Sequence, residues 1–187
     1  MKKILFCACS ALIFLACNSD KGKEVPTAAA PAEAAPATTK TLPTEIGDDK
    51  YVAIGKSGLD NLSSGNIDAW TNMFADNARY YWNGGDSLIG KQAIATYWKK
   101  RRMDAIDSIT FNTPIFLSVK VNEQQQPQHT KGNWLLSWYR VEAKYKASGK
   151  KMTQWVHTDM HFDASDKVDQ VVQYIDRTLV AAAEKKK

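Results

Sequence analysis

Cysteine and histidine are the scarcest chemically reactive residues of this 187-residue sequence, which contains three of each. All three cysteines lie within the first 17 residues, at Cys7, Cys9 and Cys17. The rest of the chain can therefore form no internal disulfide and offers no thiol for nucleophilic catalysis. The sequence also has no glycine-rich phosphate-binding loop and no nucleophile elbow around a serine. Any chemistry in the later residues has to come from other side chains.

The apolar run near the start of the sequence, at residues 4–16, is too short to cross a bilayer, because a spanning helix needs about 20 apolar residues. It follows Lys2 and Lys3 and is typical of a secretory signal peptide, which is removed. The run ends in Phe-Leu-Ala-Cys, which resembles a bacterial lipobox with Phe14 where that pattern prefers Leu. We predict a signal peptide at residues 1–16 and lipidation of Cys17. The alternative is an ordinary signal peptide followed by an accidental cysteine.

Residues 17–42 are rich in Ala, Pro and Thr and contain no aromatic residue. Such a segment cannot bury enough apolar surface to fold, and its prolines favour an extended tether. Asn18, directly after the predicted lipid-bearing cysteine, resembles cargo sent to the outer membrane of diderm bacteria. We therefore expect a protein of the cell envelope that is anchored to the membrane, most simply the outer membrane, through the lipid on Cys17.

The formal net charge of +5 says little about partners. Two of the positive charges leave with the signal peptide, and three more lie in a predicted basic tail at residues 181–187. The four cations at residues 99–102 favour a helix C-terminus and are expected to be solvated, with an anionic membrane surface as the alternative. No nucleic-acid partner is expected, because nucleic acid is the wrong ligand for an exported protein.

Residues 43–180 have the size of a single domain and contain all six tryptophans and all seven tyrosines. Apolar residues at helical spacing predict helices from about residue 48 to 63, from 67 to 74 and from 91 to 102. Alternating patterns then predict strands at residues 78–82, 109–121, 134–145, 152–162 and 168–180. Helices followed by an antiparallel meander indicate an α+β domain with helices on one face of a curved sheet.

Four local patterns in this region resemble the nuclear transport factor 2-like superfamily, especially its SnoaL-like branch. They are GNIDAW at residues 65–70, FADNA at 74–78, LIGKQAI at 88–94, and WVHTD at 155–159 with its continuation through Tyr174-Ile175-Asp176. The resemblance covers about residues 48–180. The chain departs from the family pattern at Asp166-Lys167-Val168, where Gly-Lys-Ile is usual.

The resemblance implies a cone-shaped, curved antiparallel sheet with about three N-terminal helices on its concave face and a cavity inside. It does not choose a function, because the superfamily holds isomerases, cyclases, epoxide hydrolases, dehydratases and plain binding proteins. We expect aromatic side chains to line the pocket, with packing in the core or at a dimer interface as the alternative. The expected pocket residues are Trp70, Tyr81, Tyr97, Trp138 and Tyr174.

The strand at residues 152–162 has two chemically different faces, because alternate residues of a strand share a face. One face is mostly apolar and includes Met152, Val156 and Met160, whereas the other carries His157, Asp159 and His161. A metal site on the polar face is disfavoured, because alternate residues step about 6.6 Å and the outer two cannot reach one ion. We expect neither a metal nor a cofactor.

Three further interpretations of the polar face remain, and one of them is a binding pocket in which His157 orients a ligand without chemistry. A histidine beside an aspartate can hold a pKa suited to proton transfer, so His157 is a candidate acid or base with Asp159 or Asp176 as its orienting partner. Tyr81 would then donate to a developing oxyanion. Alternatively, the face is simply solvated, or pairs with Arg140, Glu142 and Lys144 on the preceding strand.

The leading hypothesis is an anchored domain whose cavity binds a small apolar or carbonyl-containing molecule. The first alternative is a cofactor-free cavity enzyme of the isomerase, cyclase or dehydratase type that uses the His/Asp pair. The second is a protein-interaction module, most simply a homodimer, that uses the outer sheet face. Burial decides between them: His157 inside the cavity favours the enzyme, whereas Met152, Val156 and Met160 inside favour binding or scaffolding.

Overall fold

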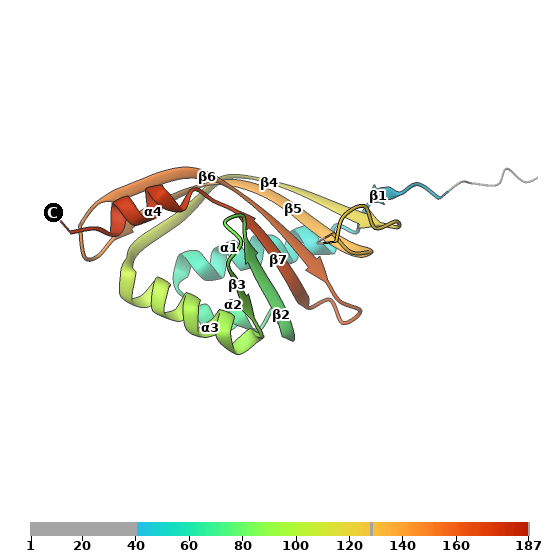
Figure 1. Ribbon diagram of the computed structural model, residues 1–187, viewed down its shortest axis with the longest axis horizontal. Coiled ribbons are helices and arrows are strands. Elements are labelled where there is room, and N and C mark those ends of the chain that lie inside the picture. Colours follow the sequence, from blue (N-terminus) through green and yellow to red (C-terminus); the bar gives the residue numbers. More distant parts are fainter. Residues whose placement is uncertain (1–40, 128, 187) are drawn as a thin grey trace, which may run out of the picture. The chain divides into compact units, whose positions relative to one another are not determined.

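The computed structural model describes residues 41–127 and 129–186, and the predicted signal peptide, Cys17 and residues 18–40 lie outside them. The elements are β1 (Thr44–Ile46), α1 (Lys50–Ser64), α2 (Ile67–Thr71), β2 (Phe74–Trp82), β3 (Ser87–Ile89), α3 (Lys91–Lys100), the π-helix η1 (Arg101–Ala105), β4 (Ile106–Val121), β5 (Gly132–Tyr145), β6 (Lys151–Phe162), β7 (Val168–Tyr174) and α4 (Arg177–Glu184) (Figure 1). No helix within the described residues is long and apolar enough to span a membrane.

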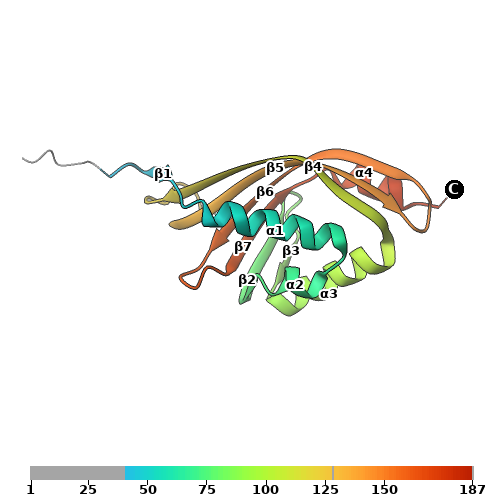
Figure 2. The same ribbon diagram turned by 180° about the vertical axis from the view of Figure 1, so that it is seen from behind.

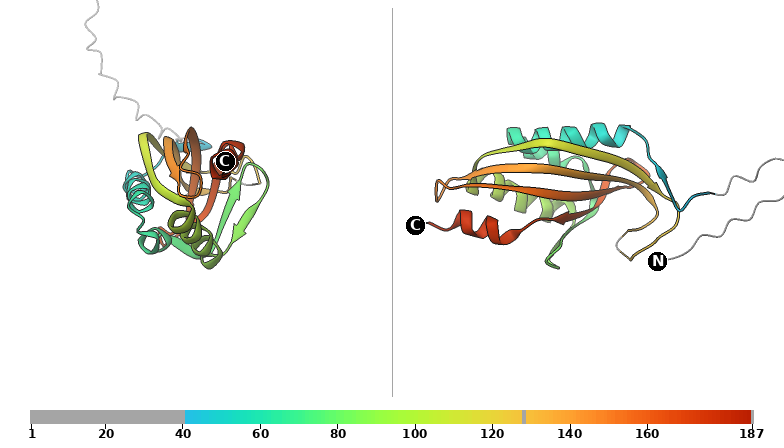
Figure 3. Two further views of the ribbon diagram at one scale, coloured as in Figure 1. Left: turned by 90° about the vertical axis from the view of Figure 1, so that its left-hand side faces the viewer. Right: turned by 90° about the horizontal axis from the view of Figure 1, so that it is seen from above.

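The seven strands form one open sheet in the order β1-β4-β5-β6-β7-β2-β3. The predicted meander is present, with β4, β5, β6 and β7 paired antiparallel in chain order. The sheet is mixed rather than purely antiparallel, because β2 pairs parallel to β7. The long strands arch over α1, α2 and α3, which lie on the concave side of the sheet (Figures 1 and 2). Seen along the long axis, the sheet curls around this interior (Figure 3).

Helix α1 packs closely on the sheet at Gly55. A Cβ atom at Gly55 would lie 2.3 Å from Cδ2 of Leu135 and 3.2 Å from Cε1 of Phe116. Glycine costs helix stability, but here it allows the helix backbone to approach β5 and β4. Leu135 itself is fully buried.

The end of the chain differs from the prediction of one strand over residues 168–180. Strand β7 stops at Tyr174, and α4 begins at Arg177. Asp176 is the N-cap of α4, and its side chain accepts a hydrogen bond from the backbone N–H of Thr178 at 2.8 Å. Val180 and Ala183 are buried, so the alternating pattern reflects a helix face that packs on the domain. The expected basic tail at residues 181–187 therefore starts within α4.

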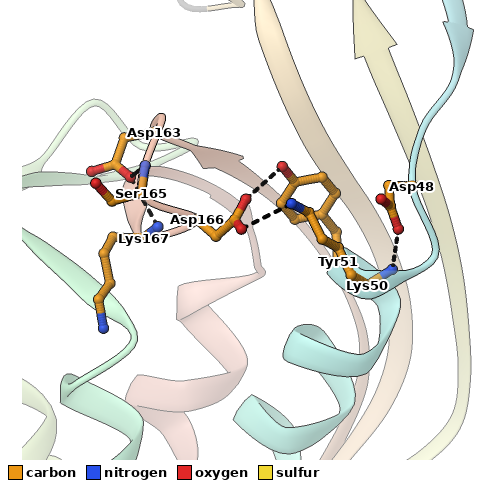
Figure 4. Close-up of polar contacts among 7 residues, drawn as sticks. All are labelled: Asp48, Lys50, Tyr51, Asp163, Ser165, Asp166 and Lys167. Atoms are coloured by element: carbon orange, nitrogen blue, oxygen red, sulfur yellow. Dashed lines mark hydrogen bonds and ion pairs between the residues drawn. The ribbon is translucent and has the colours of Figure 1, made fainter.

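The β6–β7 turn is fastened to the start of α1 through Asp166 (Figure 4). Lys50 Nζ and Tyr51 Oη each donate to the Asp166 carboxylate at 2.8 Å. Asp166 has a φ of 58°, a left-handed conformation that glycine adopts most easily. Asp166 thus adopts this turn conformation and links the turn to the helix layer through its side chain.

Candidate ligand-binding cavity

A narrow cavity of about 50 Å³ lies between the helices and the concave face of the sheet. Its walls are largely apolar and come from nearly every part of the domain. They include Leu59 of α1, Trp70 of α2, Trp98 of α3, Val156 and Met160 of β6, and Val180 of α4. Packing of the helical half against the sheet therefore creates the cavity, and α4 contributes to one of its walls.

Most polar groups at the cavity bond to one another. The hydroxyl groups of Tyr139 and Thr158 lie 2.7 Å apart, and Gln173 Nε2 donates to Thr158 Oγ1 at 3.4 Å. Gln173 Oε1 accepts from the indole N–H of Trp82 at 3.1 Å. Burial raises the pKa of Tyr139, so this phenol is a neutral hydrogen-bonding group. These hydrogen bonds link four adjacent strands, β5, β6, β7 and β2.

Trp98 is different, because its indole nitrogen is buried and has no hydrogen-bond partner among the described residues. The side chain lines the cavity. A buried donor without a partner costs about 1–3 kcal/mol. An acceptor oxygen on a bound molecule would remove that cost, so Trp98 is a candidate donor to a ligand.

Arg101 is the one charged residue among the described residues that line the cavity. Its side chain is 17% exposed, and Nη1 lies 2.8 Å from Oε1 of Glu184. Nη2 donates to the hydroxyl of Tyr145 at 2.9 Å. Burial acts to lower the pKa of Arg101, but Tyr145, Tyr97 and Glu184 outweigh burial and raise it, so the guanidinium stays charged.

The expectation that all four cations at residues 99–102 are solvated is wrong for the two arginines. Lys99 and Lys100 are exposed, whereas Arg101 faces the cavity and Arg102 donates to the backbone carbonyls of Leu62 and Ser63. The signal for Arg101 was present in the sequence. It follows Ile94, Tyr97 and Trp98 by seven, four and three residues, which places it on the same helical face.

The apolar face of β6 points inward and the His/Asp face points outward. Met152, Val156 and Met160 line the cavity, whereas His157 and Asp159 are not among its lining residues. Since side chains alternate along a strand, burying the apolar set places the polar set on the other face. The expectation that His157 and Asp159 act within the cavity therefore does not fit the structure.

Two predicted pocket residues accompany His157 on that outer face. The imidazole ring stacks between Trp138, at a centroid distance of 4.4 Å, and Tyr174, at 5.4 Å. These three residues are direct neighbours on β5, β6 and β7. Trp138 and Tyr174 thus hold the histidine ring and do not line the cavity.

The two ring nitrogens of His157 both face oxygen atoms that can accept a hydrogen bond. Nδ1 lies 3.0 Å from the carbonyl oxygen of Ser137, and Nε2 lies 2.9 Å from Oδ1 of Asp159, which is only 5% exposed. Only an imidazolium has an N–H on both nitrogens to face two acceptors. Burial acts to lower the pKa of His157, but Asp159 and the Ser137 carbonyl outweigh it and raise the pKa. Oδ2 of Asp159 lies 3.7 Å from Nε2 of His129.

The remaining predicted site residues are scattered. Trp70 lines the cavity, but Tyr81 does not; its neighbour Tyr80 does. Tyr97 lines a separate surface pocket and packs edge-on against Trp98. Asp176 is exposed, and hydrogen bonds from Thr178 hold its pKa below the usual range, as befits a helix cap. Within the described residues, no group of three or more His, Cys, Asp or Glu side chains could hold a metal ion.

No protein-family model and no curated protein matches the sequence. Solved structures of the same fold do match. One is named a putative polyketide cyclase and comes from Xanthomonas campestris pv. campestris (TM-score 0.58, 13% identity, covering 73% of this chain and 98% of that one). Another is named a putative isomerase and comes from Bacillus subtilis (TM-score 0.56, 15% identity, covering 72% of this chain and 92% of that one). A third is a nuclear transport factor 2-like protein from Burkholderia xenovorans (TM-score 0.55, 15% identity, covering 75% of this chain and 100% of that one). At these identities the likeness establishes the fold alone.

Proposed function

Since the chain has the fold of the nuclear transport factor 2-like superfamily, we propose that it is a small-molecule-binding protein whose ligand occupies the internal cavity. The composition of the cavity wall carries this proposal. The wall is apolar apart from a few positioned donors, which is the usual make-up of a ligand site. The unpaired indole N–H of Trp98 supplies one donor for an acceptor on the ligand.

Binding is favoured over acid–base catalysis by the ionisable groups available at the wall. The described lining residues include Arg101 and three tyrosines but no aspartate, glutamate or histidine. An arginine stays protonated, and burial raises the pKa of Tyr80 well above its ordinary value. Neither side chain suits proton abstraction near neutral pH. The cyclase and isomerase names of similar structures therefore support a cavity fold here and not a matching reaction.

The size of the cavity limits the ligand. At about 50 Å³ it is far smaller than the roughly 300–1,000 Å³ of drug-sized pockets, so the ligand has few non-hydrogen atoms. The walls favour a compact hydrocarbon part, and the Trp98 donor favours one acceptor oxygen. A small cyclic ketone such as cyclopentanone has both properties.

We also propose that the domain is carried at the cell envelope by a lipid on Cys17. The charged start, the apolar run at residues 4–16 and the Phe-Leu-Ala-Cys sequence support this placement. A lipid on Cys17 would anchor a protein whose described helices are too short or too polar to span a bilayer.

The cavity proposal predicts a difference between cyclopentanone and cyclopentane, which are similar in size. In ¹H–¹⁵N spectra, we expect both to perturb cavity residues, but only the ketone to shift the indole N–H of Trp98 strongly. Trp98→Phe should remove the preference for the ketone. Val156→Phe, which fills the cavity at a cost of roughly 1–3 kcal/mol in stability, should abolish binding of both.

Trp155→Phe is the matched control, because Trp155 is 55% exposed and does not line the cavity. It should leave both titrations unchanged. A folded protein in which neither compound perturbs any cavity residue would refute the cavity proposal.

A further inference from the structure

We propose that the cavity ligand carries a carboxylate, and that this group binds Arg101 in the place that Glu184 occupies in the structure. This inference rests on the proposed binding function and specifies the chemical class of the ligand. It would make the protein a receptor for a short, branched or cyclic monocarboxylic acid. The argument uses the position of Arg101, the exposure of its two partners and the charge of the surrounding wall.

Arg101 lies at the boundary between the cavity and the surface. It lines the internal cavity and also a surface pocket formed with Tyr97, Asp104 and Glu184. Tyr145 lines the same two spaces. The pair Arg101 and Tyr145 therefore separates the apolar interior from the outside. A ligand bound with its hydrocarbon part inside would bring its polar end to these two side chains.

The π-helix η1 fixes the guanidinium at this boundary. Helix α3 ends at Lys100, and the chain continues directly into the wider turn of Arg101–Ala105. Such π-helical turns are uncommon and occur frequently at functional sites. Here the turn keeps Arg101 on the same helix face as Trp98, while the backbone changes direction and enters β4 at Ile106. Arg101 is thus a positioned, preorganised donor.

The Arg101–Glu184 pair is unequal in its exposure. Only 17% of the Arg101 side chain is exposed, compared with 40% for Glu184. A buried cation needs a counter-ion, whereas a half-exposed glutamate regains water when it turns outward. Glu184 is also the last residue of α4. A ligand carboxylate that displaces the Glu184 side chain therefore keeps Arg101 paired, and the displacement costs little free energy elsewhere.

The described residues of the cavity wall include no competing acid. Among its described lining residues there is no aspartate or glutamate, so a carboxylate that enters meets Arg101 without like-charge repulsion from the wall. A planar guanidinium presents five N–H donors and matches a carboxylate with two parallel hydrogen bonds. In the structure, Nη1 of Arg101 donates to Glu184, and Nη2 donates to the hydroxyl of Tyr145. An incoming carboxylate could pair with both ends of the fork and with the Tyr145 hydroxyl.

The test is calorimetric titration of the full chain with 3-methylbutanoate and with its neutral isostere 3-methylbutanamide. We expect the acid to bind more tightly than the amide by roughly tenfold or more, the value of a charge-assisted hydrogen bond. Glu184→Gln removes the internal competitor and should strengthen binding of the acid about tenfold, with little change for the amide. Arg101→Gln should abolish the preference for the acid.

Asp104→Asn is the matched control for a general change of charge, because Asp104 lines the same surface pocket and does not pair with Arg101. It should change the affinity for the acid less than twofold. Arg101→Lys keeps the positive charge without the planar guanidinium and should retain part of the preference for the acid over the amide. This variant tests the same inference if Arg101→Gln does not fold.

The outcomes separate the two proposals. If the amide binds as tightly as the acid and Glu184→Gln has no effect, the carboxylate inference is wrong while cavity binding stands. If Glu184→Gln and Asp104→Asn strengthen acid binding equally, the effect is only general electrostatics and the inference is also wrong. If neither compound binds the folded chain, and cyclopentanone does not bind either, both proposals fail.

Discussion

Arg101 and His157 are two partly buried basic side chains, each paired with a carboxylate. Arg101 faces the apolar cavity and has one exposed carboxylate partner, Glu184. His157 is on the outer sheet face and has a buried carboxylate partner, Asp159. A carboxylate that is almost fully buried cannot return to water at low cost, so the His157–Asp159 pair is structural. In our proposal, the pair that exchanges its carboxylate for that of a ligand is Arg101–Glu184, whose acid is half-exposed.

The raised pKa of His157 predicts a pH-dependent stability. A group whose pKa is higher in the folded than in the unfolded protein contributes stability that is fully present below its unfolded pKa of about 6.5 and is lost as pH rises through the folded value. The free energy of unfolding should therefore fall as the pH rises above about 6.5 and through the folded value. Urea denaturation at a series of pH values measures this slope.

Asp159→Asn serves as the comparison, because it removes the charge that favours the imidazolium while leaving the rings of Trp138 and Tyr174 in place. In this variant the fall in the free energy of unfolding above about pH 6.5 should be smaller. His157→Gln should reduce this fall as well. A slope that is unchanged in both variants would show that His157 does not cause the dependence.

At the scale of elements, strand β6 determines which chemistry reaches the cavity. Its two faces differ in polarity, and the sheet buries the apolar one against the helices. Helix α3 and η1 supply the polar groups that the strand does not, namely the donors of Trp98 and Arg101. The candidate site therefore depends on how the helix layer is fixed on the sheet. The β6–β7 turn is one of the points of attachment.

Substitution of Asp166 separates the two roles of that turn (Figure 4). Asp166→Asn retains a side chain that tolerates the left-handed conformation but loses the ion pair with Lys50, so we expect a small decrease in Tm. Asp166→Val places a β-branched residue at a φ of 58° and should lower Tm by several degrees more. Thermal unfolding followed by circular dichroism gives both values.

Asp163→Val is not a suitable control, because Asp163 accepts from the backbone N–H groups of Ser165 and Lys167. Lys151→Val, at an exposed site at the start of β6, introduces the same residue away from the turn. Equal losses in Tm for Asp166→Asn and Asp166→Val would mean that backbone conformation plays no part at this position.

At the scale of the whole molecule, we propose that the chain combines a binding domain with a lipid anchor. Cys17→Ser removes the thiol that a lipid would modify, so we expect the variant to lose incorporation of labelled palmitate and to leave the membrane fraction. Cys9→Ser, inside the predicted signal peptide, should change neither readout. Membrane association and labelling that persist in Cys17→Ser would contradict the lipoprotein proposal.

The sequence by itself determined the class of fold. Periodicity placed α1, α3 and the long strands within a few residues, because each pattern reflects burial of one face of one local element. It did not place the end of the chain, since apolar residues in a short stretch fit either the strand predicted over residues 168–180 or the observed helix α4. It also did not indicate the parallel pairing of β2 with β7, which joins strands far apart in the chain.

Only the tertiary structure decided which side chains share the cavity. The alternation along β6 identified two faces, but assigning them required the helices that cover one of them. For that reason the sequence favoured His157, Asp159 and Tyr81 as site residues, whereas the structure brings Tyr80, Trp98 and Arg101 to the cavity wall. Periodicity along one element reports burial, while a site forms where several elements meet, and their meeting depends on contacts that are distant in sequence.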